Sequence, residues 1–307
     1  MTRQHALINA WMLAETAGLH ALFAALSLYG LQSGHTMWAI LGVVLQGVWL
    51  QRTYCVGHES SHKKLFATHP RLNDTIGQAF LFLILVPLPV FRAIHRFHHG
   101  ANRRDPHTSA LEVHVVPEGA SQARRLVPWF VWYVAVFAGG WFLHGLISVL
   151  LFLFCPPKVA RKISPAFSGW TWSQQLASIV LFGLPIAGHV AVGMLFGAAT
   201  WWVLIGAPLL VFAWVYSAQL YVYHYATTIG PETRFHARRL HGGPLLGWWL
   251  LNLNEHDTHH RQTKVVWYKL PEHAKPLPPD YAANQNVHTF GAGLLQQLKG
   301  PLILEQK

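Results

Sequence analysis

Charged residues are scarce in this sequence, and acidic ones are the scarcest. Asp, Glu, Lys and Arg make up 11% of the 307 residues, with 12 acidic against 23 basic side chains, whereas about 25% is usual in a soluble domain. This composition excludes an ordinary water-soluble globular protein. The net charge of +11 is therefore better explained by basic loops at one face of a membrane than by nucleic-acid binding, and we expect no nucleic-acid partner.

Cysteine is scarce as well. Cys55 and Cys155 lie far apart in the sequence, so the chain has neither a disulfide framework nor a Cys-x-x-Cys metal site. The sequence also lacks the glycine-rich fingerprint of a nucleotide-binding fold. Its first apolar stretch is too long for a cleaved signal peptide and lacks a small-residue cleavage site. These absences exclude a disulfide-stapled secreted domain and a Rossmann-type enzyme.

Long apolar stretches, in contrast, are abundant, and hydrophobic residues make up 52% of the chain. About 20 apolar residues span the hydrocarbon core of a bilayer. Four stretches are long enough, at residues 6–31, 36–56, 177–196 and 200–223. Short connections join the first stretch to the second and the third to the fourth. The sequence therefore predicts an all-α, multi-pass integral membrane protein with two transmembrane helical hairpins.

Two further apolar stretches test this arrangement. The stretch of residues 80–91 is too short to span a bilayer and contains two prolines, so we expect a re-entrant or interfacial segment there. Residues 129–155 are long enough to cross once, but basic residues flank both ends and Gly139 and Gly140 interrupt the middle. We therefore expect a helical hairpin that enters the membrane and returns.

The basic residues favour one orientation. With two transmembrane hairpins, every basic segment falls on the same side, which the positive-inside rule makes the cytoplasm. We expect a single domain over residues 1–307. Residues 57–128 and 224–307 would form a histidine-rich cap at the cytoplasmic side.

Histidine is abundant, with 21 residues, and three clusters stand out. They are His58 and His62, then His95, His98 and His99, and finally His256, His259 and His260. In a helix, residues three and four positions apart share a face, so each cluster gathers its imidazoles. Neutral imidazole suits iron, zinc and copper. The eight side chains are too many for one ion, so the sequence predicts a dinuclear metal enzyme.

Other interpretations of the histidines stay open at this point. His58, Glu59 and His62 match the His-Glu-x-x-His motif of zinc proteases, with Glu59 as the general base. That motif leaves the two other clusters unexplained. A histidine-rich membrane metal transporter or sensor is the non-enzymatic alternative, although it needs ligands within a transmembrane path. Isolated histidines such as His144 and His189 are expected to be ordinary polar residues.

The three clusters and their flanks resemble the histidine boxes of the membrane fatty acid desaturase superfamily. That superfamily includes acyl desaturases, hydroxylases, carotenoid ketolases and terminal-alkene-forming enzymes, and its boxes surround a di-iron centre on the cytoplasmic side. The segment 102–107, with an Asn and an Asp-Pro pair, follows the second box as it does in these enzymes. The segment 268–273 matches their Tyr-x-Leu-Pro sequence after the third box. The resemblance covers about residues 58–273 and is specific for the metal site rather than for the substrate.

The resemblance implies O2-dependent oxidation of a long-chain fatty acyl substrate, with desaturation as the first expectation. The implied cofactors are two Fe ions, with O2 as co-substrate. Hydroxylation, carotenoid ketolation and decarboxylation to a terminal alkene stay open, because fold and boxes do not decide the outcome. The substrate is expected to be a lipid, an acyl-CoA, an acyl-carrier protein conjugate or a free fatty acid. Since no haem-binding or flavin-binding appendage is visible, electrons are expected from a separate ferredoxin or cytochrome, attracted by the basic face.

One further ligand follows from the resemblance. Some family members have a histidine at the cytoplasmic end of the last span, where this chain has His224. Animal stearoyl-CoA desaturases have, four positions earlier, an Asn that serves a metal through water. Here that position is Leu220, with Gln219 beside it, and Asn252 lies four positions before the third box. The expected metal ligands are therefore His58, His62, His95, His98, His99, His224, His256, His259 and His260.

Neighbouring residues are expected to support this centre. Carboxylates close to the boxes in sequence are expected to orient the imidazoles through their second ring nitrogen, and these are Glu59, Asp105, Glu255 and Asp257. Apolar and aromatic residues near the spans are candidates for lining an alkyl-chain channel, among them Trp38, Trp214, Tyr216 and Tyr221.

Overall fold

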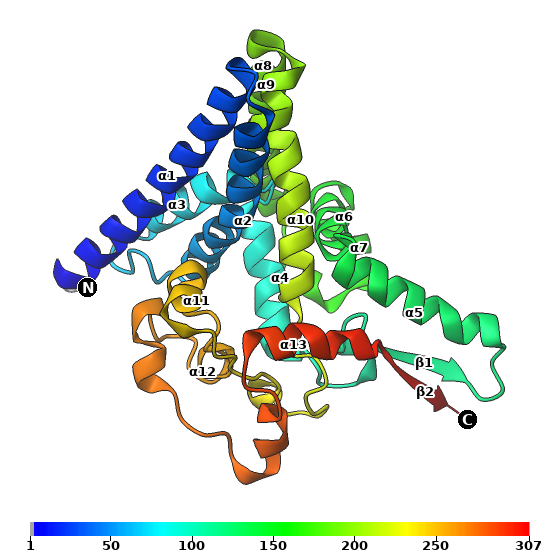
Figure 1. The fold of residues 1–307 in the computed structure, drawn as a ribbon. Coiled ribbons are helices and arrows are strands. Elements are labelled where there is room, and N and C mark those ends of the chain that lie inside the picture. Colours follow the sequence, from blue (N-terminus) through cyan, green and yellow to red (C-terminus); the bar gives the residue numbers. More distant parts are fainter. Residues whose placement is uncertain (1–2, 307) are drawn as a thin grey trace. The chain divides into compact units, whose positions relative to one another are not determined.

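The computed structural model describes residues 3–306, and most of these residues are helical (Figure 1). The chain gathers into two compact units. The first unit contains residues 1–94 and 145–215, and the second contains residues 95–144 and 216–307. The prediction of a single domain stays a prediction.

The first unit consists of helices. They are α1 (Arg3–Gln32), α2 (Thr36–Ser61), α3 (Pro70–Phe82), α7 (Pro157–Ile163), α8 (Trp172–Phe196) and α9 (Ala198–Trp201). Three more helices carry the chain from one unit into the other, namely α4 (Leu88–Ala101), α6 (Gly140–Phe154) and α10 (Ala207–Leu220). A π-helical turn, η3 (Trp202–Gly206), joins α9 to α10 without a break.

The four predicted spans are confirmed as helices that are long and apolar enough to cross a membrane. They are Arg3–Gln32, Thr36–Ser61, Trp172–Phe196 and Ala198–Leu220. In lipid every backbone group must be bonded within its own segment, which favours such unbroken helices. The bounds of these helices differ from the prediction by up to five residues. The second helix continues to Ser61, and the last ends at Leu220 instead of residue 223, because Tyr221 begins a turn whose carbonyl accepts from the N–H groups of His224 and Tyr225.

The two further apolar stretches, residues 80–91 and 129–155, are both interrupted. Helix α3 ends at Phe82 and α4 begins at Leu88, with Leu85 between them at a φ of +61°. Helices α5 (Gln122–Phe137) and α6 meet at Gly139, which has a φ of +81°, and their axes differ by 92°. The glycine pair therefore breaks the helix as predicted. That this bent pair enters the membrane and returns stays a prediction.

Helices α1 and α2 pack closely through small residues. A Cβ atom on Gly30 would lie 2.1 Å from the backbone nitrogen of Ala39, and one on Gly42 would lie 2.4 Å from that of Ser27. Small residues at such positions let two membrane helices approach backbone to backbone, where van der Waals packing replaces the hydrophobic effect. Substitution of either glycine would force the hairpin apart.

Polar side chains add directional contacts inside the first unit. The Gln46 amide donates to Ser27 Oγ at 2.9 Å and to the carbonyl oxygen of Val203, in the π-helical turn, at 3.2 Å. Six residues further along α2, buried Arg52 pairs with Glu15 on α1 and donates to Thr16 Oγ1 at 3.0 Å. Such buried polar groups are tolerated because each has a partner.

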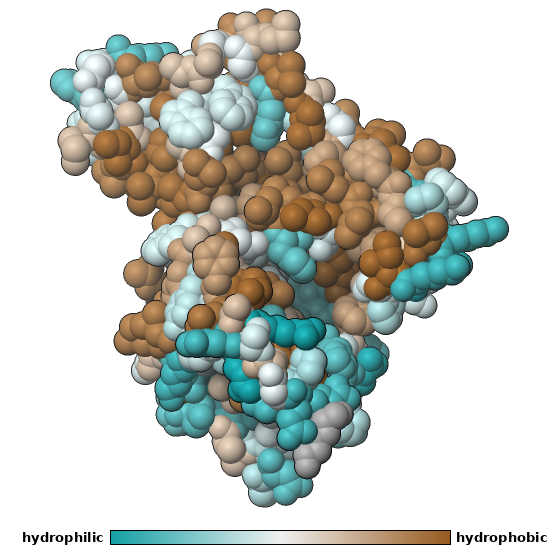
Figure 2. All heavy atoms as spheres, turned by 90° about the vertical axis from the view of Figure 1, so that its right-hand side faces the viewer, coloured by the Kyte–Doolittle hydropathy of each residue, from teal (hydrophilic) through white to brown (hydrophobic). Residues whose placement is uncertain are grey.

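The outer faces of the long helices are apolar. Only 6% of the most hydrophobic 18-residue segment of α8 is buried. The exposed side chains along this helix include Leu176, Val180, Leu184, Val190 and Met194. Figure 2 shows hydrophobic residues gathered in an extended area of the molecular surface. Apolar surface of this extent is unfavourable in water, so it is expected to face lipid.

The second unit combines short helices with a small sheet. Its elements are β1 (Val113–Pro117), α5, α11 (Gly243–Leu250), α12 (His256–Arg261), α13 (Phe290–Gln296) and β2 (Leu302–Gln306). The two strands pair in parallel, with Val113 opposite Leu302, and neither strand was predicted from the sequence. An aromatic core holds this unit together, in which Trp132 packs against Tyr221 and Tyr225 and donates to the carbonyl of Gln297 at 2.9 Å.

Candidate metal centre

The second histidine box lies on the last turns of α4. His95, His98 and His99 are spaced so that their side chains leave the helix on neighbouring sides. The Nε2 atoms of His95 and His99 are 3.0 Å apart. The helix therefore presents its imidazoles as a group, as the spacing predicted.

The third box forms its own short helix, α12. His256, His259 and His260 are buried there, with His259 completely so. Asp257 lies in the first turn of this helix and is also fully buried, and its carboxylate accepts from Arg239 and Arg261, each at 3.0 Å. These ion pairs fix a helix that is too short to be stable alone.

His224 reaches the same place from the turn after α10. Its Nδ1 lies 2.7 Å from the carbonyl oxygen of His236, and its Nε2 lies 3.0 Å from Nε2 of His256. A carbonyl oxygen can only accept, so Nδ1 carries the proton and Nε2 presents its lone pair. This is the tautomer that a metal ligand needs.

Four imidazoles from three segments converge in the second unit. His98, His224, His256 and His260 each offer one nitrogen, and these four atoms lie within 4.8 Å of one another. The Nε2 atoms of His98 and His260 are 3.2 Å apart. Two ligands at right angles around an ion, each about 2.1 Å from it, would lie about 3.0 Å apart. The donor set and its spacing therefore fit one metal ion.

The electrostatics of the cluster favour neutral imidazole. Burial, followed by the neighbouring imidazoles, holds the pKa of His224 and of His260 well below the ordinary 6.5. Both rings are therefore unprotonated at neutral pH, which is the form that binds metal. Nδ1 of His260 has no hydrogen-bond partner among residues 3–306.

Three more imidazoles of the second unit form a neighbouring group. Nε2 of His99 lies 3.0 Å from Nε2 of His95 and 3.1 Å from Nε2 of His259. These distances again fit ligands that share an ion. The second unit thus brings together all seven of its predicted ligands in two groups.

The first box lies in the first unit, at the end of α2. His58 is within the helix and His62 caps it, and the two ring centroids are 5.1 Å apart. Glu59 lies 3.5 Å from Nδ1 of His58 and 3.0 Å from the Lys64 ammonium. Glu59 therefore orients its neighbouring histidine, as predicted. With its carboxylate engaged in this way, it is badly placed to act as the general base of a zinc protease.

The other predicted supporting acids contact different groups, and for these three the prediction was wrong. Asp105 caps a short turn by accepting from Thr108 and pairs with Arg104. Asp257 binds two arginines, and Glu255 lies 3.9 Å from Arg239. The backbone carbonyl of His236 takes the role that was expected of a carboxylate. A carbonyl acceptor has no signature in the sequence, so this contact was missed.

The remaining candidates are placed as follows. Trp38 and Trp214 are 47% and 56% exposed and so point away from the interior, whereas Tyr221 is buried beside the turn that carries His224. Asn252 donates to the carbonyl oxygen of Trp267 at 3.3 Å, and Gln219 is buried. The structure thus gives the two tryptophans the position of lipid-facing residues.

Transmembrane helices together with buried imidazole clusters define the class: a histidine-rich integral membrane protein with a candidate metal centre. The sequence matches the family model described as "Fatty acid desaturase" over residues 33–291, which is most of the chain. The chain therefore belongs to the fatty acid desaturase family, a family of membrane oxidoreductases, and the predicted resemblance is confirmed.

Two plant proteins illustrate the similarity. An omega-6 fatty acid desaturase, endoplasmic reticulum, of Brassica juncea is 39% identical over 71 residues, which are 22% of this chain and 17% of the relative. A Delta(12) fatty acid desaturase FAD2 of Calendula officinalis is 39% identical over 63 residues, which are 20% of this chain and 15% of the relative. The matched part thus spans less than a fifth of each relative.

Proposed function

We propose that this protein catalyses the O2-dependent desaturation of a long-chain fatty acyl substrate at a di-iron centre. The observation that carries the proposal is the four-imidazole cluster of His98, His224, His256 and His260, three of them buried, in a member of the fatty acid desaturase family. An all-nitrogen donor set suits iron and is unsuited to calcium or magnesium.

The second ion is assigned to the remaining predicted ligands. His95, His99 and His259 form the second imidazole group, and we assign His58 and His62 to the same ion. The support for this assignment is the box spacing and the orientation of His58 by Glu59. The nine imidazoles would together hold two ions.

The chemistry needs an oxidant that side chains cannot provide. Bound iron supplies it from O2, because an unactivated alkyl C–H bond resists ordinary acids and bases. Overall, two hydrogens leave adjacent carbons, and O2 takes up these hydrogens, two electrons and two protons to give two waters. The chain's own residues bind the ions, hold His224 in the required tautomer through the His236 carbonyl, and keep the imidazoles neutral.

Substrate and electron donor follow from the family and the charge. The names of the two relatives point to a fatty acyl chain that receives a double bond. The acyl group is carried by a lipid, by coenzyme A or by an acyl-carrier protein, or is the free acid. Electrons come from a separate ferredoxin or cytochrome, which the net charge of +11 would attract if the donor is acidic.

Lipid and hydrocarbon profiling of a host that expresses the chain tests this proposal. Wild-type protein should carry about two irons per chain and introduce a new double bond. His98→Ala should abolish both properties, whereas His107→Ala, an exposed histidine after the second box, should keep them. An oxygenated product would replace desaturation by hydroxylation or ketolation, and an alkene one carbon shorter would indicate decarboxylation. Unchanged lipids with altered cellular iron or zinc would favour a transporter.

We also propose that the metal centre faces the cytoplasm, because the basic segments follow the positive-inside rule. Topology reporters at the N-terminus, within α7 and at the C-terminus should all report a cytoplasmic position. An external α7 would mean that the bent pair of α5 and α6 crosses the membrane, and the assignment of sides would then be wrong.

A further inference from the structure

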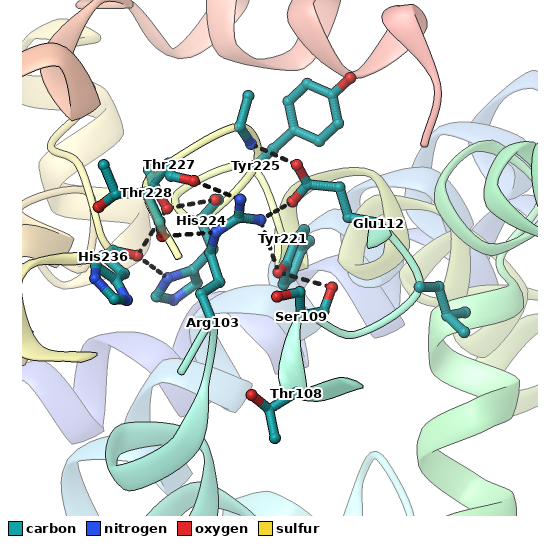
Figure 3. A network of polar contacts seen from close by, with 12 residues as sticks. Arg103, Thr108, Ser109, Glu112, Tyr221, His224, Tyr225, Thr227, Thr228 and His236 are labelled. Atoms are coloured by element: carbon teal, nitrogen blue, oxygen red, sulfur yellow. Dashed lines mark hydrogen bonds and ion pairs between the residues drawn. The ribbon is translucent and has the colours of Figure 1, made fainter. Parts of the chain in front are cut away.

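The turn that carries His224 is held from outside by charged side chains. It runs from Tyr221 to Thr228 after the end of α10, and Ala226 within it has a φ of +55°. A residue with a Cβ atom is strained in this conformation, so surrounding contacts must hold it there. Figure 3 shows the polar network that provides these contacts.

Arg103 and Glu112 together engage three consecutive residues of this turn. The Arg103 guanidinium donates to the carbonyl oxygens of Thr227 and Thr228, the latter at 3.2 Å, and forms an ion pair with Glu112. Glu112 in turn accepts from the N–H group of Ala226 at 2.8 Å. Because both charged side chains are nearly completely buried, these contacts are poorly screened and strong.

A second arginine completes the arrangement. Arg238 is fully buried and donates to the carbonyl oxygen of Tyr225, and its own backbone N–H donates to the carbonyl of Tyr223 at 2.9 Å. The backbone groups on both sides of Ala226 are therefore occupied by charged or backbone partners. The turn has little freedom to shift.

Arg103 also belongs to the segment that carries the second histidine box. It follows His99 by four residues, directly after α4 ends at Ala101, and it has a φ of +57°. The N–H of Asn102 donates to the carbonyl of His98 at 3.0 Å. The ring centroids of His98 and His224 are 4.7 Å apart. One guanidinium thus connects the backbone that positions His98 with the backbone that positions His224.

We propose that Arg103 and Glu112 are positioning residues that set the distance of His224 from the second histidine box and thereby the affinity of the four-imidazole cluster for its metal. The inference rests on the proposed metal site. A planar guanidinium serves several acceptors in fixed directions, whereas a lysine ammonium is a compact charge on a flexible stem. The shape of the Arg103 group, more than its charge, is therefore what the site uses.

Titration of the metal-free full-length protein in detergent with Co2+ alone tests the inference, because Co2+ in a nitrogen site has a visible spectrum. Arg103→Lys keeps the charge and loses the fork. We expect it to weaken one of the Co2+ sites by about 10–100-fold, the usual effect of changing a residue that orients metal ligands, and to alter the spectrum. Glu112→Gln keeps an oxygen for the Ala226 N–H and should have a smaller effect in the same direction.

The matched control is Arg52→Lys. Arg52 is as deeply buried as Arg103 and also pairs with a glutamate, Glu15, but it lies between α1 and α2 within the first unit. We expect this variant to lower the melting temperature of the metal-free protein about as much as Arg103→Lys, and to bind Co2+ with wild-type affinity and spectrum.

Three results would overturn the inference. Wild-type Co2+ affinity and spectrum in both Arg103→Lys and Glu112→Gln would reduce the pair to a fold-stabilising role. Equal weakening by Arg52→Lys would show a general effect of instability. If Arg103→Lys does not fold, Glu112→Gln decides alone. If the wild-type chain binds no Co2+, the metal site fails as well, whereas normal binding in an inactive wild-type protein would contradict only the proposed reaction.

Discussion

Helix α8 and the region around α12 depart from the usual distribution of residues in two different ways: α8 exposes apolar side chains, and the α12 region buries charged ones. Along α8 the large apolar side chains are exposed, and Leu184 keeps 54% of its surface accessible. Around α12 the fully buried side chains include Asp257 and Arg238. The ordinary rule that apolar groups lie inside therefore describes neither region.

The difference reflects two solvents. Lipid accepts exposed leucine and valine but cannot hydrogen-bond, so α8 bonds its backbone internally and presents apolar side chains. The α12 region must gather imidazoles whose supporting groups are polar, and it stabilises them with buried ion pairs. Such pairs give little net stability, but leaving one partner alone is costly. The buried ion pairs of the second unit thus position the imidazoles but add little to the free energy of unfolding.

Among the variants that test this comparison, Arg238→Met is expected to lower the free energy of unfolding the most. The substitution keeps the volume but leaves the carbonyl of Tyr225 and the side-chain oxygens of Gln296 and Asn286 without their donor. The buried carbonyl left unsatisfied costs about 1–3 kcal/mol, and loss of the two bonds to the less buried side-chain oxygens adds to this, so unfolding should become easier by about 3 kcal/mol.

Leu184→Met is the matched change on α8 and should shift stability by less than about 0.5 kcal/mol, because an exposed position gains and loses few contacts. Thermal unfolding in one detergent compares the two variants. Equal shifts would contradict the view that buried polar contacts organise the second unit more than apolar packing does.

A smaller effect is expected when a lysine is introduced at a lipid-facing position and, for comparison, at a water-exposed one. Leu184→Lys, at the middle of α8, should impair membrane insertion by about 2.5–3 kcal/mol. Ala283→Lys, at an exposed position of the turn Pro279–Gln285, should change stability by less than about 0.5 kcal/mol. Quantitative insertion assays and expression levels measure both. Efficient insertion of Leu184→Lys would mean that this face of α8 does not contact lipid.

The helices of the fold were predictable because their cause is local. Twenty or more apolar residues define a span wherever they occur, and all four spans were found in this way. The helix end at Leu220 and the pairing of β1 with β2 were not predictable. The first depends on a turn held by Arg103 and Arg238, and the second joins short strands from distant parts of the chain.

The candidate site likewise has a part that the sequence predicts and a part that it does not. His95, His98 and His99 share a helix, so their spacing alone predicted their grouping. The supporting contacts of His224 involve backbone carbonyls and a turn with Ala226 at positive φ. No residue type in the sequence indicates a carbonyl acceptor or a positive φ at an alanine. Glu59 lies 3.5 Å from an imidazole nitrogen, whereas Asp105, Glu255 and Asp257 lie beside arginines, because sequence proximity does not decide which way a carboxylate points.

The π-helical turn at Trp202–Gly206 has a consequence for how the chain assembles. Its wider winding lets the Val203 carbonyl accept hydrogen bonds from Gln46 and from Ser27, two residues of the first hairpin. Apolar side chains can slide past one another in lipid at little cost, but this carbonyl meets its donors at one register only. The last span therefore packs against the first hairpin in one defined register. An inserted or deleted residue in α9 should misalign the two hairpins even though every helix would still form.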